Sequence, residues 1–316
     1  MLYIIDYRIK KLNILFKKKE VKYEKRKHFS IILEDGHISN YKIYGNPKNN
    51  SIIYLHGFGS SASGIYINEN KLAAKNFYVI AINRPGYGSS TLKHYNITNF
   101  SRDIQSLLEK LNLDMVDIIG WSAGGTYAQI FASIYPDCVK SLTLISSAIP
   151  LKGKNTKKDL PINWKFVSFF NSYFPLMTKY YFKKLSKKIN HHIETTVKDL
   201  IDKMPEADQL VANQRHYQEL ITKAAVEAYQ NNGLAVYYDA VAMTEKVSLN
   251  YAARPYKIHI WHGEKDTVWP LKTAKILNKL YTDSSLHIIE NKGHLLYLSY
   301  FDEIVNEIEG DQARLK

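Results

Sequence analysis

The chain has 316 residues, enough for one large domain or two small ones, and its apolar content of 45% can supply a sizeable core. Its single cysteine, Cys138, excludes an intramolecular disulfide framework, and no run of about 18 uncharged apolar residues is available to span a bilayer. The net charge of +13 is concentrated in residues 1–27 and 151–200. Basic segments of this kind favour an anionic or acidic partner, or are solvated lysine-rich surfaces.

The first 28 residues are interpreted as a basic N-terminal arm. Their start, MLYIIDYRIKKLNILFKKK, is apolar first and basic second, the reverse of a secretory signal, and it lacks a small-residue cleavage site. We therefore expect no export and a cytoplasmic protein. The arm is equally compatible with an interfacial amphipathic helix, which would make the protein peripheral to a membrane, and with an element packed on the body.

From residue 29 onward, short β-branched runs alternate with helical patterns. The runs SIIYL, YVIAI, VDIIG and LTLIS are apolar on both faces, as in the central strands of a parallel sheet covered by helices. We predict an α/β fold. The expected strands are 30–33, 39–44, 51–55, 78–82, 115–120, 141–145, 257–261 and 286–289, and the expected helices between them are 99–111, 123–135, 271–280 and 301–308.

The alternation stops between about residues 150 and 250, where strand signals are missing. Helices are predicted over 162–188, 193–204 and 208–230. The simplest interpretation is a helical cap, residues 150–250, inserted into a core made of residues 29–149 and 251–316. Such an insertion would lie over the carboxyl ends of the strands, where open α/β sheets bind ligands.

Residues 118–125, IIGWSAGG, place Ser122 where a strand turns sharply into a helix. Because such a turn crowds its neighbours, the flanking positions have to be small, and Gly120 and Gly124 meet that need. A serine at this point presents its hydroxyl at the sheet edge, and the N–H of Ala123 is free to donate to an oxyanion. The alternative interpretation is a purely structural turn.

A serine nucleophile needs a base, and the base needs an orienting carboxylate. In this topology the acid and then the histidine follow at the ends of later strands. Asp266 lies just past KIHIW and His294 just past LHIIE, with Gly263 and Gly293 expected to allow tight turns. The sequence therefore predicts a triad of Ser122, Asp266 and His294. Weaker alternatives are His262 as the base and Asp239 or Asp283 as the acid.

The second oxyanion donor is expected from the loop HGFGSS, residues 56–61. Its glycines, Gly57 among them, let the backbone approach a substrate oxygen, and the N–H of Phe58 is the best candidate donor. His56 is expected to fix the loop by hydrogen bonding. Gly-Lys-Ser/Thr does not follow and Gly-x-Gly-x-x-Gly is absent, so nucleotide binding is disfavoured. We predict no metal and no cofactor.

The motifs HGFGSS, INRPGYGSS, GWSAGG, HGEKDTVWP and GHLLY, in this order, resemble the α/β-hydrolase fold superfamily over about residues 29–308. The resemblance implies a mostly parallel eight-stranded sheet flanked by helices, with the helical cap inserted after the sixth strand. It also implies the Ser122-Asp266-His294 triad, with Phe58 and Ala123 as oxyanion donors. Asn83 stands where many members carry Asp, at a structural position. HGFGSS departs from the loop of proline iminopeptidases, whereas GWSAGG is similar to the elbow of small carboxylesterases.

The expected activity is that of a serine hydrolase that cleaves a small or medium acyl ester through an acyl-enzyme. One alternative is an amidase or peptidase of the proline-iminopeptidase type, and another is a catalytically silent hydrolase-fold receptor. The peptidase needs carboxylates to bind a free amine. The candidates for that role in the cap are expected to form exposed helix faces instead: Glu206, Asp208, Glu219 and Glu227.

Residues 164–188, WKFVSFFNSYFPLMTKYYFKKLSKK, interleave aromatic side chains with lysines. The simpler interpretation is a helix pair that covers the site with its apolar face and turns its lysines outward. The sharper one is a surface for an anionic membrane or an acidic carrier protein. The expected partners are thus a small acyl substrate and, at lower weight, such a surface. Charge alone does not indicate nucleic acid.

Overall fold

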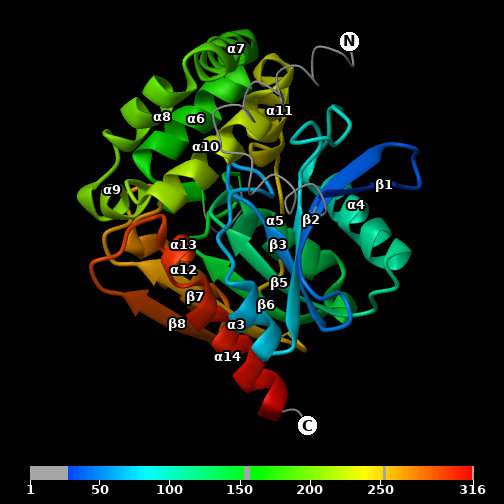
Figure 1. Cartoon of the computed structure of the whole chain (residues 1–316). Coiled ribbons are helices and arrows are strands. Elements are labelled where there is room, and N and C mark those ends of the chain that lie inside the picture. Colours follow the sequence, from blue (N-terminus) through cyan, green and yellow to red (C-terminus); the bar gives the residue numbers. More distant parts are fainter. Residues whose placement is uncertain (1–27, 153–156, 252–253, 315–316) are drawn as a thin grey trace.

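An eight-stranded sheet in the order β1-β2-β4-β3-β5-β6-β7-β8 forms the centre of the computed structural model (Figure 1). The structure describes residues 28–152, 157–251 and 254–314, so the predicted arm lies almost wholly outside the described residues. β2 pairs antiparallel with both β1 and β4, and strands β3 to β8 pair with one another in parallel. The predicted fold class is therefore confirmed.

All eight predicted strands are present, with ends that differ by no more than two residues from those expected. Their alternating side chains supply two separate cores, because successive residues of a strand point to opposite faces. Ile53 and Ile118 belong to one core, whereas Ile52 and Ile119 belong to the other. The strands are β1 His28–Ile32, β2 Ile38–Gly45, β3 Asn50–Leu55, β4 Phe77–Ile82, β5 Val116–Trp121, β6 Val139–Ile145, β7 Lys257–Gly263 and β8 Ser284–Ile289.

Helices cover both faces of the sheet. The stripe of apolar residues predicted for 99–111 is buried in α4 and packs with α5 and α12 over one face. α3, α13 and α14 cover the other face. The bounds are α3 Glu69–Ala74, α4 Ile97–Lys110, α5 Ala123–Ile134, α12 Leu271–Leu280, α13 Leu296–Ser299 and α14 Phe301–Arg314. Two short helices, α3 and α13, were not predicted.

Within the described residues, six α-helices lie between β6 and β7 and form the cap, at one end of the sheet in Figure 1. The prediction of one helix over 162–188 is wrong, because the chain breaks at Phe174. Pro175 has no backbone N–H to continue a helix, but it fits the first position of a new one. The predicted helix over 208–230 is also divided in two, and α11 was missed. The helices are α6 Ile162–Tyr173, α7 Pro175–His191, α8 Ile193–Ile201, α9 Glu206–Ala212, α10 Arg215–Tyr229 and α11 Leu234–Met243.

The direction in which the aromatic cap segment packs differs from the simpler expectation. Trp164 is half-buried and Phe182 is buried, so these two side chains face the core. The other phenylalanine and tyrosine side chains of α6, α7 and the turn between them are exposed: Phe166, Phe169, Phe170, Tyr173, Phe174, Tyr180 and Tyr181. The prediction that this segment buries its apolar face is therefore wrong for most of it. None of the helices in the described ranges is both long and apolar enough to cross a membrane.

Candidate active site

Ser122 occupies the tight connection between β5 and α5. Its backbone has φ 53° and ψ −122°, a left-handed conformation that costs a non-glycine residue on the order of 1–3 kcal/mol. Two hydrogen bonds to the next strand and the loop after it hold it there, from the Ser122 N–H to the carbonyl of Ile145 (3.0 Å) and from the Ala148 N–H to the carbonyl of Ser122 (2.9 Å). This backbone conformation points the side chain of Ser122 outward from the carboxyl ends of the strands.

The glycines that flank Ser122 are required by close packing. A Cβ at Gly124 would lie 2.0 Å from the carbonyl oxygen of Leu55, and one at Gly120 would lie 2.5 Å from the carbonyl oxygen of Gly124. Real Cβ atoms do not approach backbone this closely. The first turn of α5 can thus lie against the end of β3 only if these positions have no side chain.

The three side chains predicted as a triad meet at the carboxyl ends of their strands. Nε2 of His294 lies 3.0 Å from Oγ of Ser122, and Nδ1 of His294 lies 2.9 Å from Oδ2 of Asp266. The other carboxylate oxygen of Asp266 accepts the N–H groups of Val268 (2.9 Å) and Trp269 (3.0 Å). These bonds fix the carboxylate so that one oxygen faces the ring. Such a chain suits transfer of the Ser122 proton to His294.

The electrostatics of the pair favour its charged form. Burial opposes a charge on His294, but the charge and hydrogen bond of Asp266, followed by the charge of Asp208, raise the pKa of this imidazole above its ordinary value. Burial would raise the pKa of Asp266, yet the neighbouring His294 outweighs it and the pKa is lowered. The carboxylate therefore favours an imidazolium at His294, the form that would result from accepting the Ser122 proton.

The loops that carry the predicted oxyanion donors follow the ends of neighbouring strands, because the register pairs Leu55 of β3 with Gly120 of β5. Within the described residues, neither the N–H of Phe58 nor that of Ala123 donates to a protein acceptor. Gly57 leaves room for the indole of Trp121, which a Cβ would approach to 2.6 Å. Both amides are thus available to an oxygen bound over Ser122.

Arg84 orients the Phe58 amide. Its guanidinium donates to the carbonyl oxygens of His56 (2.6 Å) and Gly57 (2.9 Å). In a trans peptide the C=O and the N–H point in opposite directions, and no peptide in the described ranges is cis. Holding the Gly57 carbonyl toward Arg84 therefore directs the Phe58 N–H away from it.

Asp239 of α11 holds Arg84 in turn. Its buried carboxylate lies 2.8 Å from Nη2 and 3.1 Å from Nε of Arg84, and it also accepts the hydroxyls of Tyr87, Tyr95 and Tyr127. Asp239, which the sequence offered as an alternative triad acid, is therefore the buried partner of Arg84 instead. His56, expected to fix the loop, is buried, and its Nδ1 lies 2.9 Å from the carbonyl of Gly57.

The other rivals have different partners: Nε2 of His262 lies 3.7 Å from Oδ2 of Asp266, and Asp283 lies on the surface. His262 places Nε2 2.7 Å from the carbonyl of Trp269, and burial lowers its pKa, which suits a neutral packing residue. Asp283 is exposed and pairs with Lys257 (3.7 Å) on the surface. Neither side chain contacts Ser122 in the described part of the chain.

The cap reaches the histidine loop through Asp208 of α9. This carboxylate is 2% exposed and accepts the N–H of Leu295 at 2.7 Å. A Cβ at Gly293 would lie 2.4 Å from it. A tight turn begins at Gly263 as predicted, since its carbonyl accepts the N–H of Asp266 at 3.1 Å, but neither Gly263 nor Gly293 is needed for a positive φ. Instead Gly263 lets the backbone of the histidine loop approach, and Gly293 makes room for Asp208.

Two further loops of the site are also fastened to the cap. Trp164 of α6 stacks on Trp269 with ring centroids 4.8 Å apart and donates its indole N–H to the carbonyl of Val268 (3.1 Å) in the acid loop. Phe182 of α7 packs edge-to-face on Phe58, with centroids 5.8 Å apart, and Tyr229 of α10 lies against Gly59.

The expectation that the four cap carboxylates form exposed helix faces holds for Glu206 and Glu219. It is wrong for Asp208 and for Glu227, which is half-buried and accepts the hydroxyls of Ser61 (2.6 Å) and Ser63 (2.7 Å). Asp208, Arg84 and Trp164 were missed as supports of the site. Only Arg84, inside the quoted INRPGYGSS motif, had any signal in the sequence.

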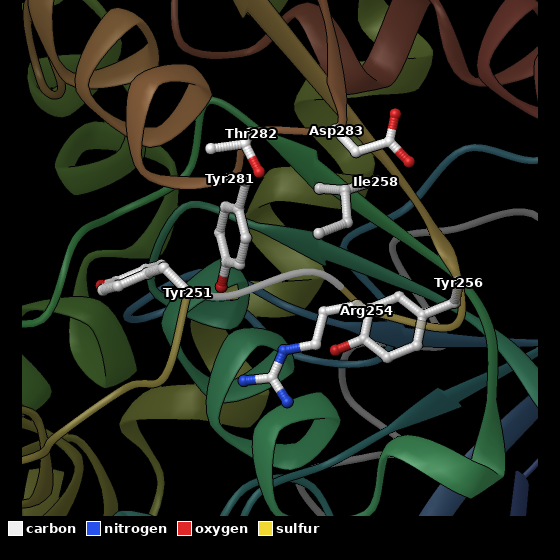
Figure 2. Close-up of a pocket in the computed structure, with 7 residues that line it drawn as sticks. All are labelled: Tyr251, Arg254, Tyr256, Ile258, Tyr281, Thr282 and Asp283. Carbon is white, nitrogen blue, oxygen red and sulfur yellow. The ribbon is translucent and has the colours of Figure 1, made fainter.

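Two other features lie apart from Ser122. His259, His287 and Glu307 gather on the face covered by α14, where Glu307 lies 3.1 Å and 2.8 Å from the two imidazoles. The hollow in Figure 2 is lined by Tyr256 and Ile258 at the start of β7 and by Tyr281 at the end of α12. β5 and β7 run in the same direction within the parallel part of the sheet. Ser122 follows the carboxyl end of β5, whereas the hollow is at the amino end of β7, so the two lie at opposite ends of the strands.

A family model described as the alpha/beta hydrolase fold matches residues 50–299. The chain belongs to the α/β-hydrolase family. Among curated relatives of this hydrolase, the uncharacterized hydrolase YcgS of Bacillus subtilis is 31% identical over 163 residues, which cover 48% of this chain and 56% of that protein. Monoacylglycerol lipase ABHD6 of Rattus norvegicus is 25% identical, and the match covers 80% of this chain and 73% of the lipase.

Solved structures share the fold of this hydrolase. An esterase from Exiguobacterium antarcticum superposes with a TM-score of 0.67 at 19% identity, covering 89% of this chain and 98% of that one. An esterase from Rhodococcus sp. ECU1013 gives a TM-score of 0.65 at 14% identity, covering 90% and 98%. At these identities the likeness extends to the architecture of the sheet and its helices.

Proposed function

We propose that this α/β-hydrolase is a serine hydrolase that cleaves small or medium carboxylic acyl esters. The observation that carries the proposal is the chain of contacts from Ser122 through His294 to Asp266, with separations of 3.0 Å and 2.9 Å. A serine with such a base and orienting acid attacks an acyl carbon. The names of several relatives, a monoacylglycerol lipase and esterases, support an ester as the substrate.

The mechanism has two steps. His294 removes the Ser122 proton as Oγ attacks the ester carbonyl, and the oxyanion is held by the N–H groups of Phe58 and Ala123. Loss of an oxyanion donor typically costs about 3–4 kcal/mol of transition-state stabilisation. His294 then protonates the leaving alcohol, and water attacks the acyl-enzyme with His294 again as the base. Asp266 holds the ring throughout.

The test is Ser122→Ala with p-nitrophenyl butyrate as substrate. We expect the variant to lose hydrolysis by a factor of at least about 1,000, because binding and the oxyanion amides alone give only a small residual rate, while its fold is unchanged by circular dichroism. Ser89→Ala, an exposed serine outside the site, is the matched control and should retain parental activity. Parental activity in the Ser122 variant would end the proposal.

Two substrates and a probe separate the alternatives. A peptidase of the iminopeptidase type would prefer an aminoacyl amide to a butyrate ester. The two buried or half-buried candidates for its amine-binding carboxylate are already engaged, since Asp208 accepts the backbone N–H of Leu295 and Glu227 accepts two serine hydroxyls. A silent receptor would fail to react with a fluorophosphonate probe, whereas the proposed enzyme becomes labelled at Ser122.

A further inference from the structure

Helices α6 and α7 present an unusual apolar surface to solvent. More than half of the exposed large hydrophobic side chains in the described part of the chain lie in these two helices and the turn between them. We call this set the aromatic cap face: Ile162, Phe166, Val167, Phe169, Phe170, Tyr173, Phe174, Leu176, Met177, Tyr180 and Tyr181. Leu176 is 80% exposed and Tyr173 is 71% exposed. Contiguous exposed apolar patches of this kind mark interaction surfaces.

The face is strongly basic as well as apolar. Residues 162–192 contain six lysines and no aspartate or glutamate. The six are exposed, and none pairs with an acidic side chain within the described ranges: Lys165, Lys179, Lys183, Lys184, Lys187 and Lys188. An occupant therefore has to offer both apolar contact and negative charge.

The need for negative charge disfavours a second copy of this chain and the N-terminal arm as occupants. A second copy docked through the same face would bring six lysines against six. The arm, residues 1–27, carries ten Lys or Arg against three acidic residues, so it has the same sign of charge as the face. Like charges brought together are destabilising.

We propose that the aromatic cap face docks on the surface of an anionic lipid bilayer. Its aliphatic and phenylalanine side chains would enter the boundary between headgroups and acyl chains, and its tyrosines suit the interface, where one end is apolar and the other wet. The lysines would lie among anionic headgroups, reached by long apolar stems. An acidic protein could neutralise the lysines, but a bilayer also covers a broad apolar surface that spans two helices.

The face and the site share the same helices. α6 carries Trp164, which contacts the acid loop, and α7 carries Phe182, which packs on Phe58. If the proposed function holds, docking would bring the site to a membrane where acyl esters with long chains reside. The docking itself does not depend on hydrolysis, so the two proposals can fail separately.

The experiment measures flotation of the full-length protein with phosphatidylcholine vesicles, with and without 30 mol% phosphatidylserine. We expect flotation with the anionic vesicles and much less with the neutral ones. Ser122→Ala protein should float equally, which separates binding from catalysis. No flotation with anionic vesicles, or equal flotation with both compositions, would overturn the proposal.

Two triple variants test the face itself. Each lysine near an anionic surface contributes about 1 kcal/mol, or about five-fold in partitioning. The changes Lys183→Gln, Lys187→Gln and Lys188→Gln together should therefore lower the partition coefficient by about a hundredfold. Tyr173→Ser, Leu176→Ser and Met177→Ser together should lower it with both compositions. These side chains are exposed, so both variants should fold, as circular dichroism would verify.

Matched controls place the same changes elsewhere. Lys110→Gln, Lys275→Gln and Lys279→Gln remove three exposed lysines, and Ile32→Ser, Met115→Ser and Leu210→Ser remove three exposed apolar side chains. These controls should float like the parent. Equal loss in the controls, or full binding by the face variants, would assign membrane binding to another surface and refute the proposal. Saturable binding of an acidic acyl-carrier protein without flotation, abolished by the lysine variant, would also refute it.

Discussion

The contact between Asp239 and Arg84 offers the sharpest test of how the cap and the site depend on each other. Both side chains are fully buried, at 0% and 1% exposure, and Asp239 is the acidic partner of Arg84 in this network. Asp239→Asn keeps the shape but removes the charge. Arg84 then remains buried without a counter-charge, and breaking such a pair costs about 3–5 kcal/mol.

This loss is large compared with the total stability of a typical domain, about 5–15 kcal/mol. Urea unfolding followed by circular dichroism should show a midpoint far below that of the parent. Tyr95→Phe is a matched control, because it removes a single hydroxyl 3.2 Å from Asp239 and should cost only about 0.5–1.5 kcal/mol. The folded fraction of the Asp239 variant should also have a lower kcat, since Arg84 holds the carbonyl opposite the Phe58 amide.

A cost of less than about 1 kcal/mol for Asp239→Asn, or a cost no greater than that of Tyr95→Phe, would contradict this prediction. Either result would mean that the neighbouring hydroxyls satisfy Arg84 without the carboxylate, which the estimate for a broken buried pair excludes.

Three further predictions concern other contacts. Asp208→Asn removes a charge that raises the pKa of His294, so the acid limb of kcat/KM should move to lower pH; an unchanged limb with only a lower rate would indicate a purely structural role. Gly124→Ala should abolish soluble folded protein or cost more than about 3 kcal/mol in urea unfolding, because its Cβ would meet the Leu55 carbonyl at 2.0 Å; near-parental stability would contradict this. Burial would lower the pKa of His259, but Glu307 and Asp311 raise it. Its stabilising charge is therefore present below pH 6.5 and lost as pH rises through the higher folded pKa. The stability difference between parent and His259→Gln should accordingly narrow from pH 6 to pH 9, and a constant difference would contradict the assignment.

The elements that could be predicted were those with local signals. Strands such as β3 and β4 are continuous β-branched runs, and Ser122 lies between small residues that a crowded turn demands. The site residues Asp266 and His294 followed from their places after strands. α11 was missed because its sequence, LAVYYDAVAM, is apolar nearly all round and has no period from which a face could be predicted.

Long-range contacts left no local signal. Asp208 binds the N–H of a residue 87 positions away, and nothing in the sequence around either residue indicates that pairing. The prediction that residues 164–188 bury their apolar face is wrong for a related reason. α6 has apolar residues on several sides, so its pattern alone does not say which side meets the core. Pro175 was a usable signal for a helix break.

The fastening of each loop to a different cap helix constrains how a substrate can enter. α6 is bound to the acid loop, α9 to the histidine loop, and α7 and α10 to the oxyanion loop. A rigid lid that swung away as one body would pull on all of these loops together and would disassemble the machinery beneath it. Admission therefore has to use local movements between the helices, which leave these contacts, and the site they support, in place.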